Sequence, residues 1–152
     1  MVKEKYYPLT SGQKGLWLLH QLDPLTDCYH IPLTFKFSNN VKLNDLEKVL
    51  AVFMQRHAIM RSSFHDLGGT PVRKENSVSS VKIIEHDVSS LNQQDLYLKV
   101  RSLSEVPFNL EQGPLLRAYV LNVYQGDKIL LIAIRHLIFD GASLCRRVGM
   151  VK

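Results

Sequence analysis

Residues 114–136, PLLRAYVLNVYQGDKILLIAIRH, decide the fold of this chain. Two apolar runs flank a short polar segment, Gln125–Asp127, which contains a glycine, and this pattern predicts a β-hairpin. The second run, Lys128–His136, is almost continuously apolar, as is typical of a central strand covered on both faces. Because a hairpin joins the two strands, we expect them to be antiparallel, which argues against a purely parallel, doubly wound sheet.

Three amphipathic segments elsewhere in the chain predict helices. The first begins at Thr10, which has capping-box spacing to Gln13, and it ends at Asp23 because the residue before a proline disfavours helical backbone. The apolar faces expected on the core are Leu16, Trp17, Leu19 and Leu22 in the first helix, Leu46, Val49, Leu50, Phe53 and Met54 in the second, and Leu96, Val100 and Leu103 in the third.

The second and third helices have recognisable boundaries. We expect Asn44 or Asp45 to cap the second helix, because short polar side chains accept hydrogen bonds from the first helical N–H groups. That helix ends near Arg56 and His57, and the third helix closes before Pro107.

The remaining periodic segments predict strands. They are Tyr29–Ser38, Arg61–Leu67 with a return strand at Pro71–Lys74, and Val81–Val88. With 152 residues the chain is long enough for a sizeable core, and we treat residues 1–152 as a single domain. The order of elements predicts an α/β (α+β) sandwich, with helices packed on a mixed, largely antiparallel sheet.

Composition narrows the function classes. The net charge is +5, but the basic residues are scattered, so a solvated surface is favoured over nucleic-acid binding. The cysteines, Cys28 and Cys145, have no metal-ligand spacing, the histidines form no HxxxH pattern, and we expect no metal site. No apolar segment has signal-peptide or membrane-spanning character, so we expect a soluble, cytoplasmic protein with no membrane partner.

The stretch RHLIFDG, residues 135–141, is the candidate for chemistry. His136 stands at a strand end, and a histidine can act as a base when burial and a hydrogen bond fix its tautomer. Gly141 permits a sharp turn, and Asp140 can brace that turn by pairing with an arginine. Neighbours on a strand face opposite ways, so Arg135 and His136 should not share a face. On spacing alone, a structural or surface histidine is the favoured interpretation.

Four stretches together resemble a known family. They are YPLTSGQKGLWLLHQLDP (residues 7–24), RHAIMRSSF (56–64), PFNLEQGPLLRAYV (107–120) and RHLIFDG (135–141). In this order they resemble the N-terminal half of a nonribosomal peptide synthetase condensation domain, in the chloramphenicol-acetyltransferase-like superfamily. A capping box and a core face account for the first stretch on their own. The ordered set of four disfavours an unrelated α/β domain.

The resemblance implies an enzyme of antibiotic biosynthesis and secondary metabolism. His136 matches the family's proposed catalytic histidine, which positions or deprotonates an acceptor amine for attack on a thioester. That thioester is carried on the phosphopantetheine of an acyl or peptidyl carrier protein, so these carriers are the implied partners and no cofactor is bound directly. The resemblance also implies a buried imidazole, whose pKa burial would lower.

The same resemblance assigns supporting roles. Asp140 is implied to be structural, with Arg61 as its first candidate partner and Arg56 as its second. Gly141 leaves room for the thioester, and a donor near the following helix start stabilises the oxyanion.

Several positions depart from the family pattern. Arg135 replaces the first motif histidine, and a buried charge must find a partner or solvent. Ala58 replaces a glutamate. If the carboxylate of that glutamate would have lain near Arg135, its loss leaves the arginine without that charged partner. Asn109 replaces an aspartate. Reduced condensation activity is therefore one expectation.

The chain stops a few residues into the helix expected after Gly141, whereas the family has two lobes with a tunnel between them. We therefore expect an N-terminal lobe without its C-terminal lobe, inactive alone and prone to self-association through exposed apolar surface and strand edges. One alternative is a non-catalytic module that binds carrier proteins, from a degenerate synthetase. Another is an acyltransferase of the same superfamily with a different acceptor.

Overall fold

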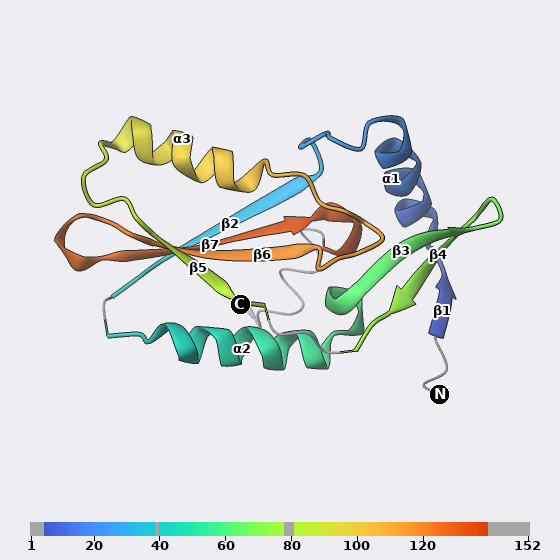
Figure 1. Ribbon diagram of the computed structural model, residues 1–152, viewed down its shortest axis with the longest axis horizontal. Coiled ribbons are helices and arrows are strands. Elements are labelled where there is room, and N and C mark those ends of the chain that lie inside the picture. Colours follow the sequence, from blue (N-terminus) through green and yellow to red (C-terminus); the bar gives the residue numbers. More distant parts are fainter. Residues whose placement is uncertain (1–4, 39, 78–80, 140–152) are drawn as a thin grey trace, which may run out of the picture.

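The computed structural model describes residues 5–38, 40–77 and 81–139 (Figure 1). Its elements in chain order are β1 (Lys5–Pro8), α1 (Ser11–Leu22), β2 (His30–Phe37), α2 (Leu43–Arg56), η1 (Ala58–Arg61), β3 (Ser62–Leu67), β4 (Thr70–Glu75), β5 (Ile83–Asp87), α3 (Gln93–Ser104), β6 (Leu116–Asn122), η2 (Tyr124–Gly126), β7 (Lys128–Arg135) and η3 (His136–Ile138), where η denotes a 3₁₀ turn. The strands form two separate sheets.

The larger sheet has four strands in the order β2-β7-β6-β5. The hairpin predicted from residues 114–136 is present: β6 and β7 are antiparallel, with Leu116 opposite Ile134 and Asn122 opposite Lys128. Strand β2 is also antiparallel to β7, whereas β5 is parallel to β6. The prediction of a mixed, largely antiparallel sheet is therefore confirmed.

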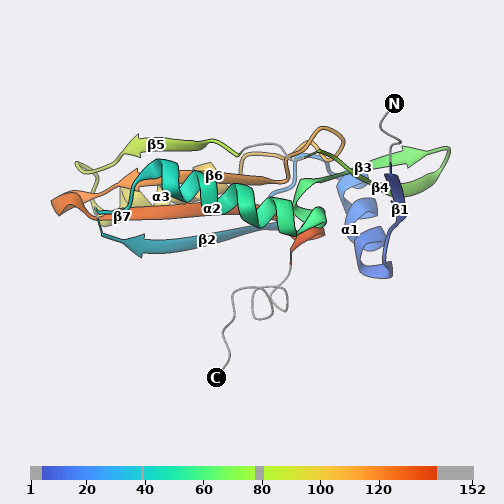
Figure 2. The same ribbon diagram turned by 90° about the horizontal axis from the view of Figure 1, so that it is seen from below.

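Helices cover both faces of this sheet, with α3 on one side and α2 on the other (Figures 1 and 2). Leu131 of β7 belongs to the cluster with Tyr119 and Leu121, against which the predicted face of α3 packs. Ile134 belongs instead to the main core, together with residues of α2. Strand β7 is thus central and covered on both faces, as its almost continuous apolar sequence predicts.

The smaller sheet, β1-β4-β3, lies with α1 at one end of the molecule (Figure 1). Gly68 and Gly69 form the turn between β3 and β4 with φ of 62° and 85°, a left-handed conformation that glycine adopts without steric cost. Phe64 of β3, together with Met54 and Met60, is fully buried where this end meets the larger sheet's core.

The helix starts test the capping predictions. The Thr10–Gln13 capping box is confirmed: the Gln13 N–H donates to Thr10 Oγ1 at 3.3 Å, and the Thr10 N–H donates to Gln13 Oε1 at 3.1 Å. The predicted cap of α2 at Asn44 or Asp45 is wrong, because both residues lie inside the helix. Lys42 occupies the cap position and makes no side-chain cap hydrogen bond.

Three leucine and valine positions assigned to the apolar helix faces are solvent-exposed. The exposed fractions are 41% for Leu19, 76% for Leu22 and 64% for Val49. In α1 and α2 the part of the helix that contacts the core is narrower than the apolar stripe in the sequence, and His20 is buried on α1 instead. In the described part of the chain, no helix combines the length and apolar character needed to cross a membrane.

Candidate active site

The chain turns at the end of β7, where His136 opens η3. Main-chain hydrogen bonds from distant segments fix this turn: the His136 N–H donates to the Tyr29 carbonyl at 2.8 Å and the Arg135 N–H to the Leu115 carbonyl at 3.0 Å. The His136 side chain itself is exposed. The described part of this chain does not bury the imidazole, and the burial that the resemblance implies for the complete domain stays a prediction.

Arg135 points the opposite way, as strand alternation predicts, and is 2% exposed. Its Nη1 donates to the Thr26 carbonyl at 3.0 Å and its Nη2 donates to His20 Nδ1 at 3.3 Å. The guanidinium carbon lies 5.6 Å from the centroid of the Tyr29 ring. The charge that replaces the motif histidine thus has uncharged hydrogen-bond acceptors and an aromatic face as partners. Burial lowers the pKa of Arg135 from its ordinary value.

His20 is the neighbour that completes this arrangement. A guanidinium has donors but no acceptors, so Nδ1 of His20 must accept and the ring proton must sit on Nε2. Burial is the main cause that lowers the pKa of His20, and the positive charge of Arg135 adds to it. Asp23 acts in the opposite direction. The structure therefore favours a neutral imidazole with a defined tautomer.

Sequence reasoning missed His20 because it was assessed only for metal-ligand spacing. A signal was present in the sequence, since His20 follows Leu16 by four residues and Trp17 by three, on the inner face of α1. A polar residue on such a face needs a buried partner.

The first stretch of the family pattern also contributes more than a helix cap. Gln13 uses its Oε1 in the capping box and its Nε2 to donate to the Leu137 carbonyl at 3.3 Å. It therefore joins the start of α1 to the η3 turn, 124 residues later. The interpretation that a capping box and a core face fully account for this stretch is wrong.

The third stretch forms a tight loop before β6. Asn109 Oδ1 accepts from the N–H groups of Glu111 and Gln112, both at 3.0 Å, and the Gly113 N–H donates to the Asn109 carbonyl at 3.0 Å. Gly113 has φ of 60°, which favours glycine. An amide oxygen accepts these bonds as a carboxylate would, so the Asn109 departure preserves the loop.

Arg117 closes the base of this loop. Its Nη1 donates to the Val106 carbonyl at 2.6 Å and its Nη2 to the Pro107 carbonyl at 2.5 Å, while its guanidinium lies 4.0 Å from the Phe108 ring centroid. The arginine at the end of the third stretch is thus a structural clamp.

Arg61, the first candidate partner of Asp140, forms an ion pair with Glu75. Its guanidinium also donates to the carbonyls of Met54, Gln55 and Asn76, at distances of 3.0–3.1 Å. Arg61 therefore joins the end of α2 to the end of β4.

The other predicted supporting residues are less constrained. Arg56, the second candidate, is exposed in the last turn of α2. Asp140, Gly141 and the proposed oxyanion donor lie outside the described residues, so their roles stay predictions. Ala58 lies in η1, where its carbonyl accepts from Ser62 Oγ at 2.8 Å.

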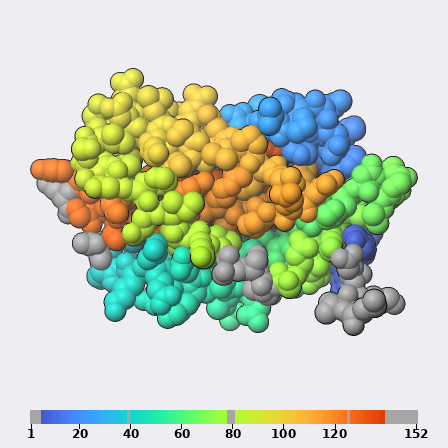
Figure 3. Space-filling view, in the orientation of Figure 1, coloured from blue at the N-terminus to red at the C-terminus, as the bar shows by residue number. Residues whose placement is uncertain are grey.

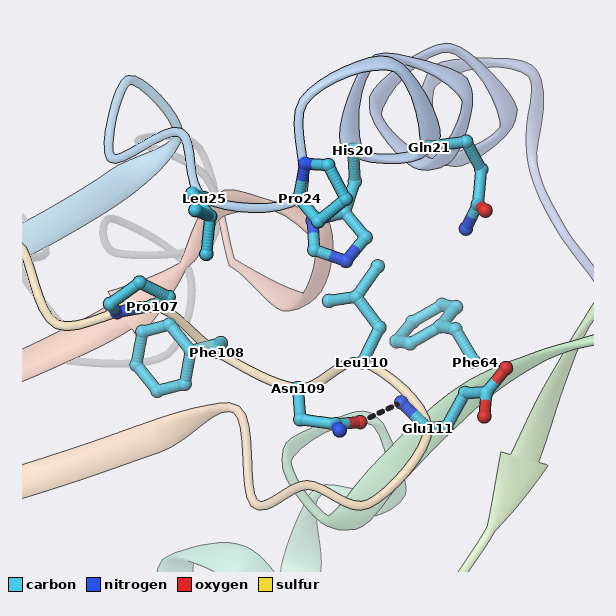
Figure 4. Close-up of a pocket in the computed structure, with 10 residues that line it drawn as sticks. All are labelled: His20, Gln21, Pro24, Leu25, Phe64, Pro107, Phe108, Asn109, Leu110 and Glu111. Atoms are coloured by element: carbon cyan, nitrogen blue, oxygen red, sulfur yellow. Dashed lines mark hydrogen bonds between the residues drawn. The ribbon is translucent and has the colours of Figure 1, made fainter.

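A cavity of about 420 Å³ lies beside this region, between the end of α1 and the loop of residues 107–111 (Figure 4). Its walls include Phe64 and Leu110, and the His20 ring points into it from α1. In the space-filling view, α1 (blue) and the loop of residues 107–111 (orange) lie side by side on one face (Figure 3). The cavity has the size of a small-molecule pocket, but His136 does not line it.

Similarity to known proteins identifies the class of this fold. A holo four-domain nonribosomal peptide synthetase, solved with AMP and glycine, superposes with a TM-score of 0.84 at 23% identity, over 95% of this chain and 11% of that chain. The starter condensation domain of rhizomide synthetase superposes with a TM-score of 0.79 at 22% identity, over 91% of this chain and 34% of that one. The fold is therefore that of a condensation domain.

Sequence similarity leads to the family. The condensation-domain family model matches residues 3–145. Polyketide synthase PksN of Bacillus subtilis is 31% identical over 95% of this chain, and bacitracin synthase 2 of Bacillus licheniformis is 32% identical over 93%. The chain spans 3% and 5% of the lengths of these relatives. This chain belongs to the condensation-domain family.

Proposed function

We propose that this chain forms the His136-bearing lobe of a condensation domain, which joins a thioester-linked acyl or peptidyl group to an acceptor amine in nonribosomal peptide or hybrid polyketide synthesis. The family match over residues 3–145 carries the proposal, because it includes all four motif stretches. The names of the relatives, which include bacitracin and linear gramicidin synthases and PksN, support the same class of reaction.

In this proposal His136 is the catalytic residue. The amine nitrogen attacks the thioester carbonyl carbon, a C–N bond forms, the C–S bond breaks, and the phosphopantetheine thiolate of the carrier leaves. The neutral imidazole accepts the proton that the amine loses and returns it to the thiolate, so the step is balanced. The fixed main chain at His136 and its exposed side chain support this role.

We infer that a second lobe covers His136 in the active assembly. The matched region is 34% of the solved starter condensation domain, so most of that domain lies beyond the part that this chain resembles. Enclosure would exclude water from the reacting thioester. The carrier proteins then bring the substrates, and no directly bound cofactor takes part. Asp140 is proposed as the brace of the turn, and exposed Arg56 is the freer candidate partner because Arg61 is paired with Glu75.

The test supplies the chain with a separately produced second lobe, an acyl-loaded carrier and an acceptor aminoacyl carrier. We expect amide product that His136→Gln lowers by about 100-fold or more, as loss of a general base does. His86→Gln is the matched control, since His86 lies on β5 and should leave the rate unchanged.

Each other outcome favours a different function for this chain. Carrier binding without product under every condition would overturn the catalytic proposal and favour the non-catalytic module. Product that is insensitive to His136→Gln would remove His136 from the chemistry. Transfer to a free, carrier-independent acceptor would favour the acyltransferase alternative.

A further inference from the structure

The segment between α1 and β2, residues 23–29, is held against the end of β7 at three points. Arg135 Nη1 donates to the Thr26 carbonyl at 3.0 Å, and its guanidinium lies 5.6 Å from the Tyr29 ring centroid. The third point is the His136 N–H, which donates to the Tyr29 carbonyl at 2.8 Å. The side chain of Arg135 and the main chain of His136 therefore hold the same segment from two sides.

The guanidinium reaches this segment from a fixed position. Its second arm, Nη2, donates to His20 Nδ1 at 3.3 Å, inside the protein, where His20 is 8% exposed and Arg135 is 2% exposed. A planar guanidinium can serve two acceptors at once, whereas an ammonium group lacks this forked geometry. His20 thus sets the orientation in which Arg135 meets the Thr26 carbonyl.

We propose that His20 and Arg135 act together as positioning residues, which hold residues 23–29 and thereby the main chain of the catalytic His136, and that they do so only while His20 is neutral. The proposal rests on the proposed role of His136. It assigns a partner to the arginine that replaces the first motif histidine, so the replacement keeps the site ordered instead of dismantling it.

The charges around His20 explain why its neutral form is required. Arg135 on β7 and His30 on β2 both disfavour a positive charge on the ring, whereas Asp23 at the end of α1 favours one. Glu111, on the loop across the cavity, lines the same space and is exposed. A protonated His20 has no lone pair on Nδ1, so it loses the hydrogen bond and places a second cation beside the guanidinium.

The experiment measures the pair directly in the full chain by NMR. The ¹⁵N shifts of the His20 ring report which nitrogen carries the proton, and the exchange protection of the His136 amide reports the contact with Tyr29. At pH 7.5 we expect the Nε2–H tautomer, and protection about tenfold lower in Arg135→Gln, as for a lost hydrogen bond to a charged group. As the pH falls, protection should decrease together with protonation of His20.

Two substitutions at His20 separate positioning from general stability. His20→Asn keeps an acceptor oxygen near the Nδ1 position but cannot titrate. Protection of the His136 amide should therefore be retained, and it should not show the decrease at low pH that protonation of His20 causes in the wild type. His20→Leu keeps the bulk and loses the acceptor, so protection should fall about tenfold at every pH. Arg117→Gln, which removes a partly buried arginine clamp elsewhere, should leave His136 protection unchanged.

The proposal is overturned by an Nδ1–H tautomer, or by wild-type protection that is independent of His20 protonation. The wild-type titration and the His20→Asn variant test the proposal even if Arg135→Gln fails to fold. None of these readouts requires turnover. If His136 proves not to be catalytic, the NMR result on His20 and Arg135 still stands. If the NMR result contradicts the positioning role, the catalytic proposal for His136 is still tested by turnover.

Discussion

At the scale of single residues, Arg135 shows how a non-conservative change can be accommodated. A buried cation is costly when it is unpaired, and the structure meets this demand with the Thr26 carbonyl, His20 Nδ1 and the Tyr29 ring. The sequence predicted that the charge needs a partner. The only nearby partner it suggested was the carboxylate that is lost where Ala58 replaces a glutamate. The partners come instead from α1 and the segment after it.

Arg135→Lys should destabilise the protein by about 1–3 kcal/mol, because one buried acceptor loses its donor. Urea unfolding followed by circular dichroism measures this loss. Arg101→Lys is the control: Arg101 pairs with Glu105 on the surface of α3, where the same change should cost less than about 0.5 kcal/mol. Equal losses in the two variants would contradict the clamp described for Arg135.

At the scale of elements, the family stretches meet through hydrogen bonds that no local pattern predicts. Gln13 of α1 donates to the Leu137 carbonyl in η3, and the Leu115 carbonyl before β6 accepts from the Arg135 N–H. The capping box at Thr10 was predictable, since it depends on residues three apart. The second use of Gln13 was not, because its partner lies 124 residues away.

Gln13→Glu separates these two uses. A glutamate keeps the acceptor of the capping box but cannot donate to the Leu137 carbonyl while it is ionised. We expect α1 to retain its helicity while the turn at His136–Ile138 loosens, with a cost of about 1 kcal/mol. Amide exchange across α1 and η3 measures both effects, and Gln13→Leu should weaken both elements. Loosening of α1 alone in Gln13→Glu would argue against the link to η3.

At the scale of the whole molecule, two histidines, the buried His20 and the partly buried His30, link stability to pH. Burial is the main cause that lowers the pKa of both His20 and His30 below the ordinary value of 6.5. The folded protein then binds fewer protons than the unfolded chain between each lowered pKa and 6.5. Stability is therefore complete above pH 6.5 and is lost as the pH falls through this window.

Thermal or urea unfolding between pH 7.5 and 5 should show this loss, with a slope of up to about 1.4 kcal/mol per pH unit for each histidine. His20→Asn should lower the slope by up to one such contribution. Val49→Asn on the exposed face of α2 supplies a control, since it removes no titratable group and should leave the slope unchanged. A slope unchanged by His20→Asn would contradict the assignment.

The surface of the whole molecule leads to a second prediction at this scale. Leu18 and Leu22 in α1 and Leu25 in the segment after it are 56%, 76% and 75% exposed, and exposed leucines gathered in one part of the chain favour association. We expect concentration-dependent self-association of the chain in sedimentation velocity, and Leu22→Lys should reduce it. Val49→Lys on α2 is the matched control. Equal effects of the two lysines would indicate a general charge effect instead of a specific surface.

The sequence by itself determined the helices, the order of most strands and the hairpin, because periodicity, capping and turns depend on residues close together in the chain. It also determined the central position of β7 and the place of His136 at its end. It did not indicate β1 or the division of the strands into two sheets. Tertiary structure alone decided the surroundings of that end: the exposure of His136, the ion pair of Arg61 with Glu75, and the meeting of Arg135 with His20. These partners lie 14 to 115 residues apart, so packing of whole elements sets their contacts.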